Sequence, residues 1–149
     1  MNVSVDFTYQ TEFVLVDEQM FVNWLTKCAK QYSATSMALV YAFMDDKALL
    51  ELNLKYLKHN TLTDIITFDD TVGKDVDANI AISVTRVREN AAVHQVPFDE
   101  ELIRVVSHGL LHCLGFKDKT TTQQSEMRKA EQACIQLFHV EQNKEKHVS

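Results

Sequence analysis

The stretch Phe98-Asp-Glu-Glu-Leu-Ile-Arg-Val-Val-Ser-His-Gly-Leu-Leu-His-Cys-Leu-Gly115 decides the fold, because it predicts a helix that is apolar nearly all round. Pro97 and Asp99 mark its start, where acidic side chains suit the positive end of the helix dipole. A helix of this kind needs cover on every side, so we expect it at the centre of the domain. Its apolar members are Leu102, Ile103, Val105, Val106, Leu110, Leu111 and Leu114.

The same helix carries a candidate metal site. His108 and His112 are four residues apart, so both imidazoles lie on one face and can reach a single ion. Gly115 can end the helix in a left-handed turn, and the reversed chain could return Asp118 as a third ligand. Two histidines and a carboxylate leave one tetrahedral position for water, as catalytic sites with one Zn²⁺ do. The alternative is a buried helix that merely contains two histidines.

Periodicity outside this helix predicts an α+β domain, with a small mixed sheet of about four strands packed against about five helices. Expected strands cover residues 3–9, 36–44, 65–68 and 79–83, and an acidic loop covers 69–77. Asp17, Asp45 or Asp46, and Ser83 are the expected caps of helices reaching about residues 32, 57 and 94. A last helix is expected over about 121–140, with 140–149 as a frayed tail.

Length and composition are those of one globular domain over residues 1–149. The chain has 46% hydrophobic and 24% charged residues, and no apolar run of membrane-spanning length. The N-terminus lacks the basic and apolar regions of a signal peptide, and Cys28, Cys113 and Cys134 form no paired pattern. We therefore expect a cytoplasmic protein without disulfides. The net charge of −6 does not suggest binding to nucleic acid.

The spacing His-x-x-x-His-x-x-Gly-x-x-Asp is close to the zincin pattern, in which two helical ligands and one after a glycine hold zinc. Zincin peptidases place a glutamate directly after the first histidine, where it activates the attacking water. Here that position is Gly109. The pattern therefore favours metal-assisted hydrolysis and disfavours a metallopeptidase, which remains an alternative function.

With its neighbouring blocks, the segment His108–Phe116 resembles the YbeY family of bacterial metal-dependent endoribonucleases. Leu52-Asn-Leu-Lys-Tyr56, Leu62-Thr-Asp-Ile-Ile-Thr-Phe68 and Asn79-Ile-Ala-Ile-Ser83 resemble further family blocks in the expected order, and the resemblance covers roughly residues 36–138. It implies a zinc-dependent, single-strand-specific endoribonuclease that acts in 16S rRNA 3′-end maturation and ribosome quality control. Its implied partners are single-stranded or ribosomal RNA and the small ribosomal subunit, with no membrane; the oligomeric state is left open.

Three positions depart from the family pattern. Asp118 stands where many members have histidine, which keeps a zinc ligand and adds a negative charge. Leu57 stands where an arginine thought to contribute to activity is common, and Ala78-Asn79 replaces the usual Gly-Asp. The last two departures leave room for a third function, that of a non-catalytic, metal-stabilised protein associated with the ribosome.

Several side chains are candidate helpers of the reaction. Arg104 lies one turn before His108 and could grip a phosphate, or else pair with Glu100 or Glu101 on its own helix. His59 could act as general base or be a solvated loop histidine. Four basic residues could bind the RNA backbone or merely solvate their helices: Lys55, Lys58, Arg86 and Arg88.

Overall fold

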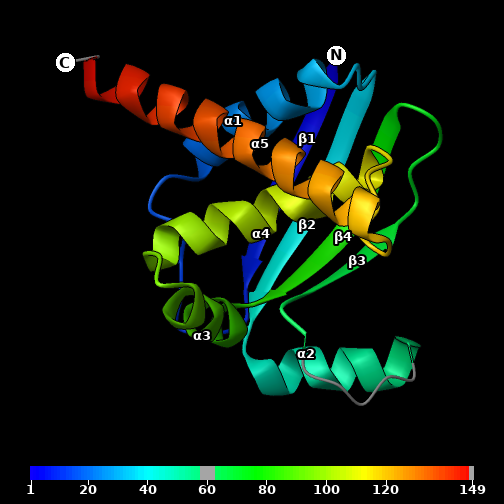
Figure 1. The fold of residues 1–149 in the computed structure, drawn as a ribbon, viewed down its shortest axis with the longest axis vertical. Helices are drawn as coiled ribbons and strands as arrows, with labels where there is room; N and C mark the ends of the chain where they lie inside the picture. The colour runs from blue at the N-terminus through cyan, green and yellow to red at the C-terminus, as the bar shows by residue number, and fades with distance from the viewer. Residues whose placement is uncertain (58–62, 148–149) are drawn as a thin grey trace.

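The computed structural model describes residues 1–57 and 63–147, which form four strands, five α-helices and one π-helical turn (Figure 1). The strands are β1 (Asn2–Tyr9), β2 (Ser36–Met44), β3 (Ile65–Asp69) and β4 (Asp75–Ser83). The helices are α1 (Glu18–Gln31), α2 (Asp46–Leu52), the π-helical turn η1 (Asn53–Leu57), α3 (Val84–His94), α4 (Phe98–Cys113) and α5 (Thr121–His147).

The four strands form one mixed sheet in the order β1-β2-β4-β3. β1 and β2 pair in parallel, as do β2 and β4, whereas β3 runs antiparallel to β4 at the edge. In this register Ile65 lies opposite Ile82 and Thr67 opposite Ile80, so these residues share one face of the sheet. The predicted α+β class, with a mixed four-stranded sheet and five helices, is confirmed.

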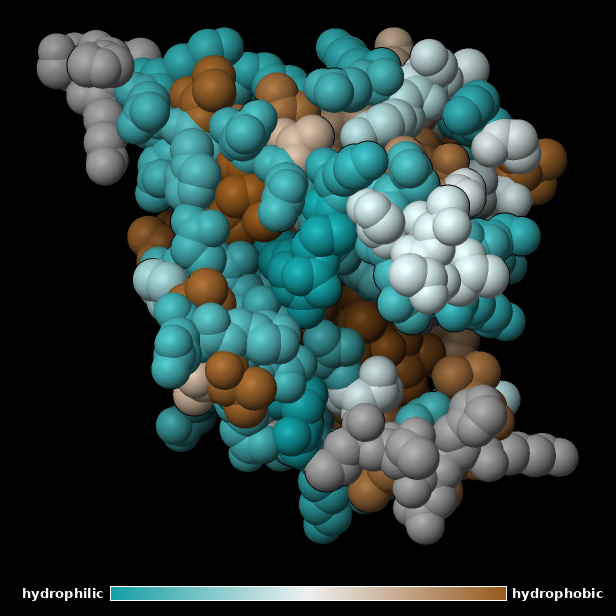
Figure 2. All heavy atoms as spheres, viewed as in Figure 1, coloured by the Kyte–Doolittle hydropathy of each residue, from teal (hydrophilic) through white to brown (hydrophobic). Residues whose placement is uncertain are grey.

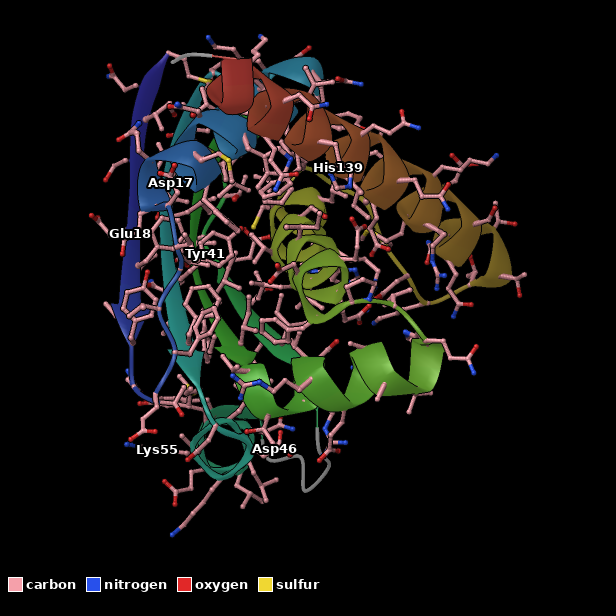
Figure 3. The ribbon with its side chains drawn as sticks, turned by 90° about the vertical axis from the view of Figure 1, so that its left-hand side faces the viewer. Asp17, Glu18, Tyr41, Asp46, Lys55 and His139 are labelled. Carbon is pink, nitrogen blue, oxygen red and sulfur yellow. The ribbon has the colours of Figure 1, made fainter. Side chains whose placement is uncertain are left out.

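One face of the sheet carries the main core. Tyr41 points from β2 into this core (Figure 3) and donates its hydroxyl to the carbonyl of Val106 in α4 at 2.9 Å. Figure 3 shows α1, α4 and α5 together on this side of the sheet. On the other face α2 covers a small second cluster, where Leu49 packs with Ile66 and Ala81. As predicted, α4 is central, since its apolar residues belong to the main core.

The expected helix caps are present. Asp17 accepts a hydrogen bond from the backbone N–H of Met20 at 3.1 Å, and Asp45 accepts one from Ala48 at 2.8 Å. Ser83 accepts the N–H of Arg86 at 3.0 Å. Each side chain satisfies one of the N–H groups that a helix leaves without an internal partner.

Three element boundaries differ from the expectation. β4 begins at Asp75, because its first residues pair with β2 from Ser36 onward, so the predicted loop over 69–77 is shorter. The helix expected to reach Leu57 ends at Leu52 and continues as the π-helical turn η1. α5 runs past residue 140 to His147, since Glu141 is buried against α1 and forms an ion pair with Lys27.

The packing leaves hydrophilic side chains at the surface and buries the three cysteines. Hydrophilic side chains cover most of the face that α4 and α5 present (Figure 2). In the described part of the chain no helix is both long and apolar enough to cross a membrane. Cys28, Cys113 and Cys134 are buried free thiols.

Candidate functional site

A single polar stripe runs along α4. Between Glu101 and His112 every residue is buried except Arg104, His108 and His112, which recur at four-residue spacing. The core therefore fixes the helix on its other sides and aims these three side chains toward one place. The predicted alignment of Arg104 with the two histidines is confirmed at the level of the helix face.

The stripe forms one wall of a cleft of about 340 Å³. The start of β3 and the residues before it form another wall, and Asp118 lies at the mouth. The lining residues are Thr63, Asp64, Ile65, Thr67, Arg104, Val105, His108, His112 and Asp118. The three predicted metal ligands thus line the same cleft, although they come from α4 and from the loop after it.

Asp118 reaches the cleft because the chain reverses at Gly115. Gly115 has φ +104°, and the helix end is closed by the N–H of Phe116 donating to the carbonyl of Leu111 at 3.0 Å. The following residues lead to α5, where the Thr120 hydroxyl accepts the N–H of Gln123 at 3.1 Å. The predicted left-handed turn at Gly115 is confirmed.

His108 lies between two carboxylates. Its Nδ1 is 2.7 Å from Oε2 of Glu131, a residue of α5 that is 2% exposed. Its Nε2 is 3.4 Å from Oδ2 of Asp118, which is 48% exposed. A carboxylate that binds one ring nitrogen and leaves the other toward a ligand is the usual support of a metal-binding histidine.

The donor set fits a zinc ion, although it is not closed around one. Among the residues described, no three or more His, Cys, Asp or Glu side chains are already grouped so that they could hold a metal ion. However, 3.4 Å is about the separation of two donor atoms that each lie ~2.1 Å from a tetrahedral zinc. His112 and Asp118 are exposed, so their rotamers can change without repacking the core.

Arg104 is held by acidic neighbours. Its Nε and Nη2 donate to the two oxygens of Glu101 at 3.0 and 2.6 Å, and its Nη1 lies 3.4 Å from both oxygens of Glu131. Its Nη2 is also 3.9 Å from Asp64. The hydrogen bonds to Glu101, with the nearby negative charges, raise the pKa of Arg104 above its ordinary value, so the guanidinium stays charged. Of the two predicted roles, the structure contains the ion pair with Glu101.

Of the predicted RNA-binding residues, the three that the structure describes do not line this cleft. Arg86 pairs with Asp46 at 2.8 Å and with Glu89 at 2.7 Å, and Arg88 lies over the ring of Phe98. Lys55 lies at the far end of the sheet, on η1 (Figure 3). Lys58 and His59 fall outside the described residues.

Glu131 and Asp64 are parts of the site that the sequence prediction omits. Asp64 accepts a hydrogen bond from Asn90 at 3.4 Å and lines the cleft opposite α4. The sequence does contain a signal for Glu131, because its spacing places this acid on the same buried stripe of α5 as Met127 and Cys134. An acid on such a stripe needs a partner within the protein, and here its partners are His108 and Arg104.

Gly109 faces away from the cleft, toward the sheet. A Cβ at this position would lie 3.0 Å from Cδ1 of Ile80 and 3.1 Å from Cδ1 of Ile65, so glycine lets α4 approach the sheet closely. The position where zincin peptidases carry their glutamate therefore has no space for that side chain and no access to the cleft.

Comparison with known proteins places the sequence among endoribonucleases. The family described as Endoribonuclease YbeY matches residues 6–139. Proteins named Endoribonuclease YbeY from Flavobacterium psychrophilum and Flavobacterium johnsoniae are 42% and 45% identical, each over 93% of this chain and 99% of its own length. The one from Christiangramia forsetii is 46% identical over 93% of this chain and 96% of its own.

A solved structure has the same fold. The solution structure of TM1509 from Thermotoga maritima matches with a TM-score of 0.66, covering 96% of this chain and 93% of that one. At 20% sequence identity this likeness concerns the fold alone.

Proposed function

This chain belongs to the YbeY family of endoribonucleases, and from that premise we propose that it is a zinc-dependent endoribonuclease specific for single-stranded RNA. Endoribonuclease activity follows from the family. The finer proposal is that one Zn²⁺ is held by His108, His112 and Asp118, and that the substrate is the 3′ end of 16S rRNA during maturation and ribosome quality control. The observation that carries the metal proposal is the pairing of His108 with buried Glu131, which leaves Nε2 toward the cleft.

The charge of the cleft also supports a metal. Four carboxylates, those of Asp64, Glu101, Asp118 and Glu131, lie in the cleft or directly behind it, against the one guanidinium of Arg104. With neutral histidines the net charge is −3, which repels a phosphodiester. A bound divalent cation would bring this net charge to −1 and would supply a positive centre for an RNA phosphate.

These contacts assign a separate role in the reaction to the zinc ion and to each side chain. When bound, zinc lowers the pKa of a coordinated water to about 7 and polarises a phosphoryl oxygen. Glu131 holds the His108 ring in orientation, and Asp118 supplies an anionic donor at the mouth. Arg104 is the cation that pairs with the carboxylates of Glu101 and Glu131 behind the cleft.

The decisive experiment measures metal content and cleavage together. The purified protein is stripped with a chelator and reloaded with zinc, then given an RNA oligonucleotide alone or annealed to its complement. We expect cleavage of the single strand only, loss of cleavage after stripping, and recovery with zinc. A 16S rRNA precursor with an extended 3′ end should be cut in its single-stranded tail.

Each other outcome of this experiment rejects part of the proposal. Unchanged cleavage in the stripped protein rejects the metal mechanism. Zinc binding without cleavage of any single strand favours a metal-stabilised binding protein, and cleavage of an unstructured peptide by the zinc-loaded protein favours a peptidase.

Asp118 can be tested by two substitutions with opposite expected effects on zinc binding. We expect Asp118→Asn to weaken zinc binding at least about 10-fold, because an amide oxygen is a poorer zinc ligand than a carboxylate. Asp118→His should retain zinc binding, since imidazole is a good ligand at the same place. Competition titration with a chromogenic chelator measures both variants, with exposed Asp70→Asn as the matched control. Equal zinc affinity of wild type and Asp118→Asn would remove Asp118 from the ligand set.

A further inference from the structure

We propose that Glu131 is the positioning residue of this cleft. It fixes the His108 imidazole with the proton on Nδ1 and the Nε2 lone pair toward the cleft, and Arg104 holds Glu131 in place from behind. The inference rests on the proposed function, because it concerns the same cleft. It assigns Arg104 a role in supporting the site and not in contacting a phosphate.

Glu131 is placed for this role by its burial and its partners. It lies on the inward stripe of α5 and is 2% exposed, so its ionised form needs pairing within the protein. His108 Nδ1 at 2.7 Å and Arg104 Nη1 at 3.4 Å provide that pairing. Arg128 lies 3.8 Å away but is exposed, which makes it the weakest of the three.

The two carboxylates that flank His108 compete for its ring proton, and geometry decides between them. A carboxylate can only accept, so whichever carboxylate binds more strongly selects the protonated nitrogen. Glu131 is 2.7 Å from Nδ1 and buried, whereas Asp118 is 3.4 Å from Nε2 and half exposed to solvent. The shorter, buried contact is the stronger one, so the proton resides on Nδ1 and Nε2 keeps its lone pair.

The contacts of Arg104 explain why it supports the site instead of binding substrate. It bridges two carboxylates, Glu101 and Glu131, that are each 2% exposed. Turning the guanidinium toward a phosphate would break the bidentate pair with Glu101 and leave both acids buried without their cation. Arg104 is therefore a fixed part of the wall, and through Glu131 it acts on the orientation of His108.

The first test is a pair of matched substitutions on α5. Glu131→Gln keeps the size of the side chain and removes its charge, and Glu126→Gln makes the same change at an exposed position of the same helix. We expect Glu131→Gln to lower zinc affinity about 10- to 100-fold and Glu126→Gln to leave it within about 2-fold. Chelator competition measures affinity, and thermal unfolding of the metal-free proteins monitors the fold. Equal zinc affinity of folded Glu131→Gln and wild type overturns the proposal.

A second measurement needs no variant. The ¹⁵N chemical shifts of the His108 ring, recorded on the wild-type protein with and without zinc, report which nitrogen carries the proton. We expect the proton on Nδ1 in both states and zinc on Nε2. A proton on Nε2 in the metal-free protein, or zinc on Nδ1, overturns the proposal. Absence of zinc binding by the wild type instead rejects the proposed function, while the metal-free spectrum still tests the role of Glu131.

Arg104→Met separates the two roles of the arginine. The positioning role predicts a lower zinc affinity and a broadened or shifted His108 signal in this variant. Contact with a phosphate predicts weaker RNA binding with zinc affinity and the His108 signal unchanged, and that result overturns the role inferred for Arg104.

Discussion

Replacement of His112 by alanine is expected to abolish RNA cleavage and to weaken zinc binding by more than about 100-fold, because it removes one of three proposed ligands. His112 is exposed at the end of the polar stripe on α4, so its removal leaves no cavity in the core. The free energy of unfolding of the metal-free protein should therefore change by less than about 0.5 kcal/mol. A large functional loss without a loss of stability is the signature of a ligand.

The control for this variant is a histidine outside the cleft. His139 lies on α5 and contacts Glu100 at 2.8 Å, and it lines no part of the cleft. His139→Ala should cleave RNA and bind zinc like the wild type. Cleavage rates follow from a fluorogenic single-stranded oligonucleotide, and stability follows from urea denaturation of both variants. Retention of cleavage by His112→Ala would show that the activity does not depend on the proposed metal.

Gly109→Glu is expected to destabilise the protein by more than about 3 kcal/mol, and not to create a peptidase. The new side chain would start 3.0 Å from Ile80 and 3.1 Å from Ile65, between α4 and the sheet, where a carboxylate has no water and no cation. Urea denaturation measures the loss of stability. A stable Gly109→Glu variant would mean that α4 can move away from the sheet, contrary to the packing seen here.

A smaller substitution isolates the steric part of this effect. Gly109→Ala gains about 1 kcal/mol of helix propensity and costs about 1–3 kcal/mol through crowding. Ile80→Val removes the Cδ1 methyl that a Cβ at residue 109 would meet. In the Ile80→Val background, Gly109→Ala should therefore be more favourable by at least about 0.5 kcal/mol. Strict additivity of the two changes in free energy of unfolding would show that the Ile80 Cδ1 methyl does not crowd a Cβ at residue 109.

The elements of the fold follow from signals that are local in sequence. The caps Asp17, Asp45 and Ser83 and the turn at Gly115 depend only on residues within one helical turn, and each is found as expected. The start of β4 depends instead on its pairing with β2, which lies some forty residues earlier. The last turns of α5 likewise depend on contact with α1. Such boundaries are set by tertiary contacts that periodicity does not contain.

The site divides in the same way. His108, His112 and Asp118 share one motif, so their spacing alone predicts that they line a common cleft. Glu131 lies on another helix, 23 residues beyond His108, and nothing near it in sequence names its partner. Arg104 allowed two interpretations because helix geometry offers both a cleft and an acid one turn back. The structure shows that Glu101 of the same helix holds it, and that the packing of α4 against α5 brings Glu131 to it as well.

The contact between His108 and Glu131 also makes the orientation of His108 depend on the docking of α5. The polar stripe belongs to α4, whereas the carboxylate that orients His108 belongs to α5, the helix that follows. α5 follows α4 in the chain, so Glu131 can reach His108 only after α4 has been synthesised. A chain in which α5 is not docked has both histidines but lacks the carboxylate that orients His108, so we expect it to bind zinc more weakly than the folded protein.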